Sequence, residues 1–405
     1  MSGGGARAAY QVGVLAEIAQ MRKHARLALT QAPETAAQPT AMLGNPFPII
    51  SGTSAGAINA AVLACGADDF DATMEELVEV WAHFHVGQVY DTGVFGMVKS
   101  GARWLSLLSL GWLLRQKRFR PKSLLNNHPL RALLHQRVRF ERLPMLLQDG
   151  HLQALAITAS SYSTGEHVTF FESGTPLSPW VRNQRLAQRC PLSVPHLLAS
   201  AAIPFVFPAE RLDGPQGAAF FGDGSMRQTA PTSAAIHLGA ERILVIGVGR
   251  MHEPEQHLQA EPQYPNLAQI AGHALSSIFL DSLAVDVERL RRINQTLQLI
   301  PSDKRADTHL RPVDLLLIAP SKRLDVMAAA HAHALPPTVK SLLRTLGRAD
   351  APAPGQGDTL LSYLLFEAPY TQALMDLGRA DAAAQSAEIH RFFGWNAPIQ
   401  GLANR

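Results

Sequence analysis

Short apolar runs alternate with longer stretches of helical periodicity along most of the chain. Runs of this kind that end near glycine, serine or aspartate are typical of buried strands, and longer stretches with apolar residues at every third or fourth position are typical of helices. The pattern predicts strands at residues 47–50, 154–159, 167–171, 218–221, 243–248 and 314–319. It predicts helices at 54–65, 267–296 and 360–393, and a further helix within 3–27 after a glycine loop. Strands separated by helices indicate an α/β core.

A polar, proline-containing stretch after residue 250 indicates a boundary or a surface loop. We therefore expect a first domain at 1–250, with an apolar and basic insertion at about 86–125. The remainder, 251–405, is expected to be a mainly helical C-terminal region whose strand at 314–319 joins the core.

Composition and charge narrow the class of protein. Of 405 residues 17% are charged, and the net charge of +3 is mildly basic, without the zinc-finger spacing or long basic run of a dedicated nucleic-acid protein. The two cysteines, Cys65 and Cys190, form no disulfide framework or metal pattern and are expected to be inert thiols. No stretch predicts a transmembrane helix or a signal peptide, so a cytoplasmic location is the default expectation.

The segment Gly52-Thr53-Ser54-Ala55-Gly56 lies between an expected strand and an expected helix. A G-x-S-x-G turn in that context presents a serine oxygen at the end of the strand, with Gly52 and Gly56 permitting the sharp turn. The same motif also occurs by chance in a packed strand-to-helix turn, so Ser54 is a candidate nucleophile that needs supporting residues.

A glycine loop, Gly3-Gly4-Gly5-Ala6-Arg7, opens the first expected helix. Backbone N–H groups in such a loop can bind an anion, either a phosphate or the oxyanion of an acyl-transfer reaction. The acidic residue of a dinucleotide site and the Gly-Lys-Ser/Thr ending of a P-loop are both missing from the sequence. With a serine elbow downstream, an oxyanion hole is the better interpretation.

An aspartate flanked by glycines, in Gly222-Asp223-Gly224-Ser225, follows an apolar run. Asp-Gly is also a common turn signal. A carboxylate at this position can act as a general base if it reaches the serine proton.

Together these three segments resemble the signatures of the patatin-like phospholipases, in the order of that family. The stretch at 199–208 is also similar to a segment that those proteins carry before the aspartate. The resemblance implies a three-layer α/β/α fold with a mostly parallel sheet, and hydrolysis of fatty-acyl esters of phospholipids or lysophospholipids without a cofactor or metal. It implies Ser54 as nucleophile, Asp223 as base with Gly224 supporting it, and an oxyanion hole at Gly3, Gly4, Gly5, Ala6 and Arg7.

The chain departs from the family pattern at three points near these motifs, one of which is Ala8, where many members carry glycine. Ser225 stands where family members usually carry glycine or alanine, and only Met1 and Ser2 precede the glycine loop where members have an apolar strand. We expect from this that the natural protein begins upstream with such a strand, because its loss would leave neighbouring strands with unpaired edges.

The insertion contains a very apolar stretch next to a cluster of cations. Tryptophans beside leucines with adjacent cations are typical of an interfacial membrane element, and also of a buried helix that covers a site. The buried helix is favoured, because apolar helices usually lie in the core. Both interpretations hold if the segment is a lid that opens on lipid, and the candidates for such a lid with peripheral membrane contact are Trp104, Trp112, Arg115, Lys117 and Arg118.

Three alternatives remain open at this point. A Ser-His-Asp triad is formally available, because several histidines follow Asp223, among them His237, His252, His273, His309 and His390. An acyltransferase could use the same elbow. A lipid-binding regulatory protein without catalysis could keep the same fold.

Overall fold

Nine strands form two sheets in the computed structural model, which describes residues 1–30, 44–91, 123–182, 184–214, 217–250, 264–305, 307–308, 310–345 and 357–395. The larger sheet has the order β4-β5-β3-β2-β7-β6, and β1 also pairs with β2; the smaller sheet joins β8 to β9. The strands of the larger sheet are β1 (Ile49–Thr53), β2 (Ala154–Ser161), β3 (His167–Ser173), β4 (Val181–Arg182), β5 (Arg185–Arg189), β6 (Glu210–Gly214) and β7 (Gly217–Asp223). Those of the smaller sheet are β8 (Arg242–Ile246) and β9 (Asp314–Ile318).

The pairing of the strands is mixed, which corrects the expectation of a mostly parallel sheet. Strand β2 is parallel to β1 but antiparallel to both β3 and β7, and β6 is antiparallel to β7. Short connections are the physical reason for the pairs β2–β3 and β6–β7, because two strands joined by a tight turn can pair only in antiparallel fashion. Strands β2 and β7 are joined by a long connection, which permits either orientation. The α/β class itself agrees with the sequence pattern.

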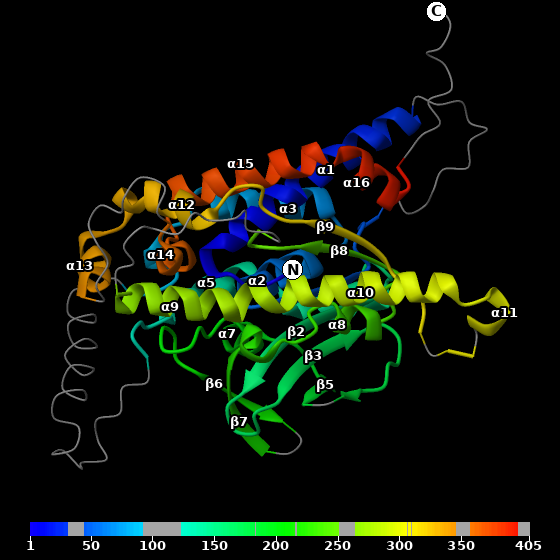
Figure 1. Ribbon diagram of the computed structural model, residues 1–405, viewed down its shortest axis with the longest axis horizontal. Helices are drawn as coiled ribbons and strands as arrows, with labels where there is room; N and C mark the ends of the chain where they lie inside the picture. The colour runs from blue at the N-terminus through cyan, green and yellow to red at the C-terminus, as the bar shows by residue number, and fades with distance from the viewer. Residues whose placement is uncertain are drawn as a thin grey trace, which may run out of the picture.

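Helices cover both faces of the strands, as a three-layer arrangement requires. Ala235 of α8 and Leu283 and Val287 of α10 pack on one face of β8 and β9. The opposite face, which includes Ile246 and Ile318, belongs to the main core with α1, α2 and α15. In Figure 1, α1 and α15 lie along the top, and α9 and α10 cross the front between β8 and the larger sheet.

The helices have the following bounds. They are α1 (Ala9–Thr30), α2 (Ala55–Cys65), α3 (Phe70–Ala82), α5 (His128–Arg137), α6 (Leu143–Gln148), α7 (Val194–Ser200), α8 (Ser233–His237), α9 (Leu267–Ser276), α10 (Ser282–Leu299), α11 (Ser302–Arg305), α12 (Leu324–Ala330), α13 (Pro337–Thr345), α14 (Thr359–Leu364), α15 (Ala368–Ala384) and α16 (Ser386–Phe393). Single turns of 3₁₀-helix lie at Gly5–Ala8, Val86–Gln88, Phe140–Arg142, Gly224–Arg227 and Ala332–Ala334, and Ser277–Asp281 is a π-helical turn.

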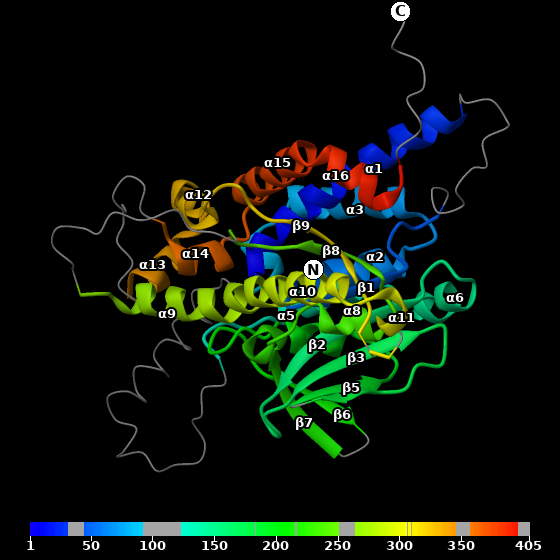
Figure 2. The same cartoon turned by 45° about the vertical axis from the view of Figure 1, so that its right-hand side comes forward.

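The C-terminal helices pack directly on the N-terminal helix. Both views show α15 lying along α1 (Figures 1 and 2). Gly13 faces the backbone of Met375 so closely that a side chain at Gly13 would clash with it, and the hydroxyl of Tyr10 donates to Asp381 at 3.0 Å. The region 357–395 is therefore part of the same core as the glycine loop.

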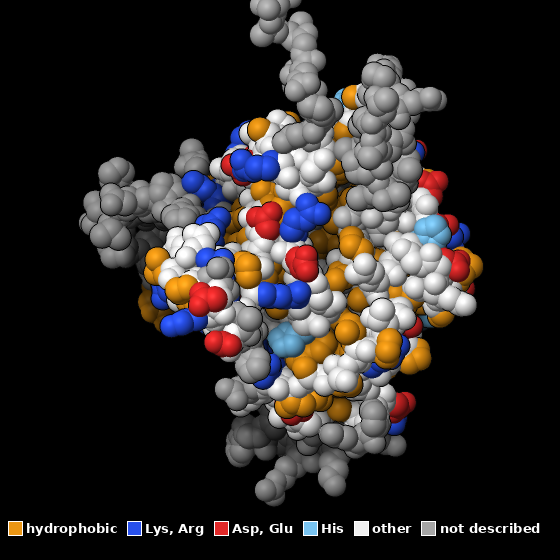
Figure 3. All heavy atoms as spheres, turned by 90° about the vertical axis from the view of Figure 1, so that its right-hand side faces the viewer, with side chains coloured by type: hydrophobic (Ala, Val, Ile, Leu, Met, Phe, Trp, Pro, Cys, Tyr) orange, Lys and Arg blue, Asp and Glu red, His pale blue; other side chains and the backbone are white. Residues whose placement is uncertain are grey.

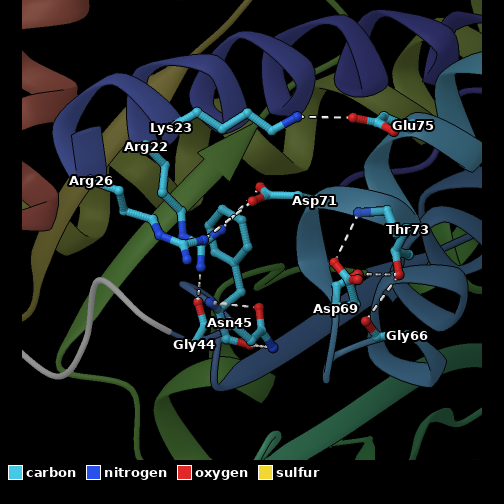
Figure 4. A network of polar contacts seen from close by, with 12 residues as sticks. Arg22, Lys23, Arg26, Gly44, Asn45, Gly66, Asp69, Asp71, Thr73 and Glu75 are labelled. Atoms are coloured by element: carbon cyan, nitrogen blue, oxygen red, sulfur yellow. Dashed lines mark hydrogen bonds and ion pairs between the residues drawn. The ribbon is translucent and has the colours of Figure 1, made fainter. Parts of the chain in front are cut away.

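Ion pairs hold the far end of α1 to α3. Arg22, a buried side chain, contacts Asp71 at 3.0 Å, and Lys23 contacts Glu75 at 2.9 Å (Figure 4). Arg22 also donates to the carbonyl of Gly44 at 2.6 Å. These contacts fix α3 beside α1, and α3 in turn forms part of the wall of the candidate site.

One helix requires a second correction. The segment Leu267–Leu299, which comprises α9, the π-helical turn and α10, is long and apolar enough to cross a membrane by length and composition alone, contrary to expectation. Leu283, Val287 and Leu290 of this helix pack against β8 and β9. Core helices of globular proteins can be equally long and apolar, so the length and composition of this helix do not by themselves indicate a membrane span.

A groove separates β1 from β8, and the first residues of the chain lie at its end. Met1 accepts a hydrogen bond from the N–H of Thr53 at 3.2 Å, and the N–H of Ser2 donates to Ile246 at 3.5 Å. The groove beyond Met1 is lined by residues of both strands, including Ile49, Ile50, Ser51, Arg242, Ile243 and Leu244. On the side of the molecule that faces right in Figure 1, hydrophobic side chains lie across the middle of the surface among charged ones (Figure 3).

We predict that joining four β-branched apolar residues to Met1 stabilises the fold. Met1 is half-buried, and burial of its ammonium group lowers the pKa of that group from 8.0 to about 6. Below pH 6 the buried charge costs on the order of 3 kcal/mol, and this cost disappears above pH 8. The extension removes the charge and lets its own backbone pair with both strand edges. Thermal unfolding at pH 6 should show a higher Tm than the 405-residue chain.

A glycine-serine extension of the same length is the matched control. It removes the ammonium group but has little tendency to form a strand, so it should recover only the pH-dependent part of the gain. Equal Tm values for both extensions at pH 8 would contradict strand pairing in the groove.

Candidate active site

Ser54 occupies a strained turn between β1 and α2. Its backbone has φ 55° and ψ −133°, a conformation that L-residues rarely adopt and that costs about 1–3 kcal/mol. The two flanking glycines allow this turn: a Cβ on Gly52 would lie 2.5 Å from the carbonyl of Gly56, and a Cβ on Gly56 would meet the carbonyl of Ser2. The turn leaves the Ser54 side chain at the N-terminus of α2.

Asp223 lies beside Ser54 because both strands end on the same edge of β2. The register pairs Thr53 with Thr158, and Asp223 with the next residue, Ala159. Since β1 is parallel and β7 antiparallel to β2, their C-terminal ends meet. The hydroxyl of Ser54 donates to Oδ2 of Asp223 at 2.6 Å.

The carboxylate of Asp223 is fully buried. Burial raises its pKa from 3.8 to about 6, although hydrogen bonds from Ser54 and Ser225 favour the charged form. The N–H of Ser225 donates to Oδ1 at 2.9 Å, which leaves Oδ2 directed at the serine. Gly224 passes so close to the carbonyl of Thr158 that a side chain there would clash. A carboxylate held in this way can accept a proton near neutral pH.

The glycine loop lies against the serine. A Cβ on Gly3 would be 2.9 Å from Cβ of Ser54, so only glycine allows this approach. Within the described part of the chain, the N–H groups of Gly3 and Gly4 donate to no protein acceptor. Two N–H groups beside a serine hydroxyl are a suitable pair of donors for an oxyanion.

Arg7 anchors the glycine loop. Its buried guanidinium donates to the hydroxyl of Ser362 through Nε at 2.9 Å and Nη2 at 2.7 Å, and it lies 4.1 Å from the ring centroid of Tyr363. Gly5, at φ 53°, and the buried Ala6 continue the loop over α14. The side chain of Arg7 therefore fixes the loop, whereas the sequence suggested only a donor role for this segment.

Sequence reasoning missed Ser200, which supports the elbow from α7. Its hydroxyl accepts a hydrogen bond from the N–H of Ser54 at 2.8 Å and donates to the carbonyl of Thr158 at 2.6 Å. The only available signal was its position in the family-like stretch at 199–208. Phe279, in the π-helical turn, also contacts Gly3 and had no signal in the sequence.

An apolar cavity has Ser54 in its lining. Its walls come mainly from α2, α3 and α5, and Gly5, Ala201 and Phe366 also line it. Apart from Glu76 and Arg137, the lining side chains beyond Ser54 are uncharged and almost all hydrophobic. Such a cavity suits a hydrocarbon chain.

No histidine of the described residues hydrogen-bonds Ser54 or Asp223. His237 instead stacks on Trp180 with its centroid at 4.8 Å, His273 is exposed on α9, and His390 lies against Trp395. His252 and His309 lie outside the described residues, as do the lid candidates Trp104, Trp112, Arg115, Lys117 and Arg118. Among the described residues, no cluster of three metal-binding side chains is found.

We predict that Ser200→Ala lowers turnover and leaves the protein folded. The change leaves the buried N–H of Ser54 without an acceptor, which costs about 1–3 kcal/mol and loosens a strained residue. Kinetics on a soluble ester should show a kcat at least tenfold lower. Ser160→Ala is the matched control on β2, because the buried hydroxyl of Ser160 has no partner within the described structure. Equal kcat for the two variants would contradict a role for Ser200.

Comparison with known proteins agrees with the motif pattern. The model of the family "Patatin-like phospholipase" matches residues 1–236, more than half of the chain. A search of curated proteins returned no match. The matched range includes the glycine loop, the serine elbow and the aspartate. This chain belongs to the patatin-like phospholipase family, a family of lipid acyl hydrolases.

Proposed function

We propose that this protein hydrolyses fatty-acyl esters of phospholipids or lysophospholipids by a Ser54–Asp223 dyad. The observation that carries the proposal is the 2.6 Å hydrogen bond from the Ser54 hydroxyl to a fully buried carboxylate. A serine oxygen becomes a strong nucleophile only when a base takes its proton. Asp223 is the base within hydrogen-bond distance, and its raised pKa favours proton transfer near neutrality.

The reaction begins when Ser54 Oγ attacks the ester carbonyl carbon and its proton passes to Asp223. The carbonyl oxygen becomes an oxyanion, which the N–H groups of Gly3 and Gly4 stabilise. Collapse of this intermediate breaks the ester bond, and the departing alcohol takes the proton from Asp223. The acyl group stays on Ser54, with its hydrocarbon chain in the apolar cavity.

Water completes the cycle. Asp223 takes a proton from a water molecule, whose oxygen attacks the acyl-enzyme carbonyl. The second intermediate collapses to a free fatty acid, and the proton returns from Asp223 to Ser54. We propose that the enzyme acts in the cytoplasm with peripheral contact at the membrane, since its substrates reside there.

Substitution of either dyad residue tests the assignment. Ser54→Ala and Asp223→Asn should each lower kcat on a short soluble ester by more than a thousandfold, because one removes the nucleophile and the other cannot take its proton. Labelling by a fluorophosphonate probe should disappear in Ser54→Ala. Circular dichroism should show both variants folded. Retention of most activity in Asp223→Asn, with loss in a histidine variant, would replace the dyad with a triad.

The pH dependence gives an independent prediction. Asp223 must be ionised to accept the serine proton, and its pKa is raised to about 6. The value of kcat/KM should therefore fall tenfold per pH unit below about 6 and be constant from pH 7 to 8. An acid limb near pH 4, the range of an ordinary aspartate, would show that another group is the base.

A further inference from the structure

The cavity that has Ser54 in its lining runs between three helices. Its walls include Ile58 and Val62 of α2, Leu77, Val80 and Trp81 of α3, and Leu130, Leu133 and Leu134 of α5. From Ala55 to Val62 the helix α2 advances about 10 Å along this wall. The cavity is therefore deep relative to the ester that reacts at its start.

Contacts at the two ends of the cavity show how it is oriented relative to Ser54. Near the serine, the chain that leads into α5 is tied to the segment after α7, because the N–H of Leu125 donates to Val206 at 2.8 Å. At the other end, Arg142, which follows α5, donates to the carbonyl of Cys65, the last residue of α2, at 3.2 Å. Helices α2 and α5 thus both run away from the reaction site.

An ion pair lies at this far end. Nη1 of Arg137 contacts Oε1 of Glu76 at 3.2 Å, and both residues line the cavity. Their side chains are 47% and 43% exposed, so the pair stands between the apolar interior and solvent. An exposed pair of this kind adds little to stability, on the order of 0–1 kcal/mol. Its chemical contrast with the cavity walls suggests a function in the cavity itself.

We propose that the Glu76–Arg137 pair closes the far end of an acyl-chain tunnel and so sets the length of chain that the enzyme accepts. This inference rests on the proposed function. Methylene groups between Ser54 and the pair gain the free energy of apolar burial. A longer chain must push its methyl end against two charged groups, which lose hydration without gaining a partner.

The dependence of kcat/KM on chain length tests this proposal. With p-nitrophenyl esters from butyrate to stearate, each methylene that becomes buried should raise kcat/KM about fourfold. In the unaltered protein this rise should stop when the chain reaches the ion pair. In Glu76→Leu and Arg137→Leu, each of which removes one charged group from the far end, the rise should continue to longer chains. Val62→Phe narrows the middle of the tunnel and should end the rise at shorter chains.

Glu75→Ala is the matched control. Glu75 lies next to Glu76 on α3 but pairs with Lys23 of α1 and does not line the cavity (Figure 4). This variant should keep both the chain-length limit and the butyrate turnover of the unaltered protein.

The outcomes separate this inference from the function on which it rests. An unchanged limit in both Glu76→Leu and Arg137→Leu, with butyrate turnover that depends on Ser54, would overturn the proposed closure and leave the hydrolase intact. Turnover of butyrate that survives in Ser54→Ala would overturn the proposed function and, with it, this inference. A shift in the limit for Glu75→Ala equal to that for Glu76→Leu would show a general charge effect and would also overturn it.

Discussion

The hydrogen bond between the Ser54 hydroxyl and the Asp223 carboxylate is the interaction on which the geometry of the candidate site depends. Burying a charged carboxylate costs free energy because the group loses its hydration, and the raised pKa of Asp223 reflects part of that cost. The fold tolerates it because the serine hydroxyl and the N–H of Ser225 both donate to this group. The strained backbone of Ser54 adds a second cost at the same place. Stability is thus reduced where a reactive geometry is required.

Strand β2 makes this geometry possible. One edge of β2 is divided between two partners, with β1 on its first half and β7 on its last residues. A purely parallel sheet would bring Ser54 and an equivalent aspartate to the same edge but not head to head. The mixed pairing therefore has a consequence for the site: it places the ends of two opposed strands against neighbouring residues of a third.

The three motifs of the candidate site could be identified in the sequence, but the packing around them could not be predicted. The elbow at Ser54, the glycine loop and Asp223 carry short-range signals, because each needs particular residue types within a few positions. Most strands were predicted within two or three residues of their observed ends. The supporting contacts are long-range: Ser200 reaches Ser54 from 146 residues away, and Ser362 reaches Arg7 from 355. No periodicity or motif encodes such pairs. The antiparallel pairing of β2 with β7 could not be predicted for the same reason, since a long connection joins these two strands.

The matched family range ends at residue 236, yet the site extends beyond it. The glycine loop is held by Ser362 and Tyr363 of α14, and Phe366 lines the same cavity as Ser54. Donors of an oxyanion hole help only when they are fixed before charge develops. The loop has its fixed partner in α14, which contacts it directly and is itself packed against α9 and α12. The C-terminal helices therefore contribute to the candidate site in two physical ways, by holding the glycine loop and by forming part of the wall of the apolar cavity, although Ser54 and Asp223 both lie before them.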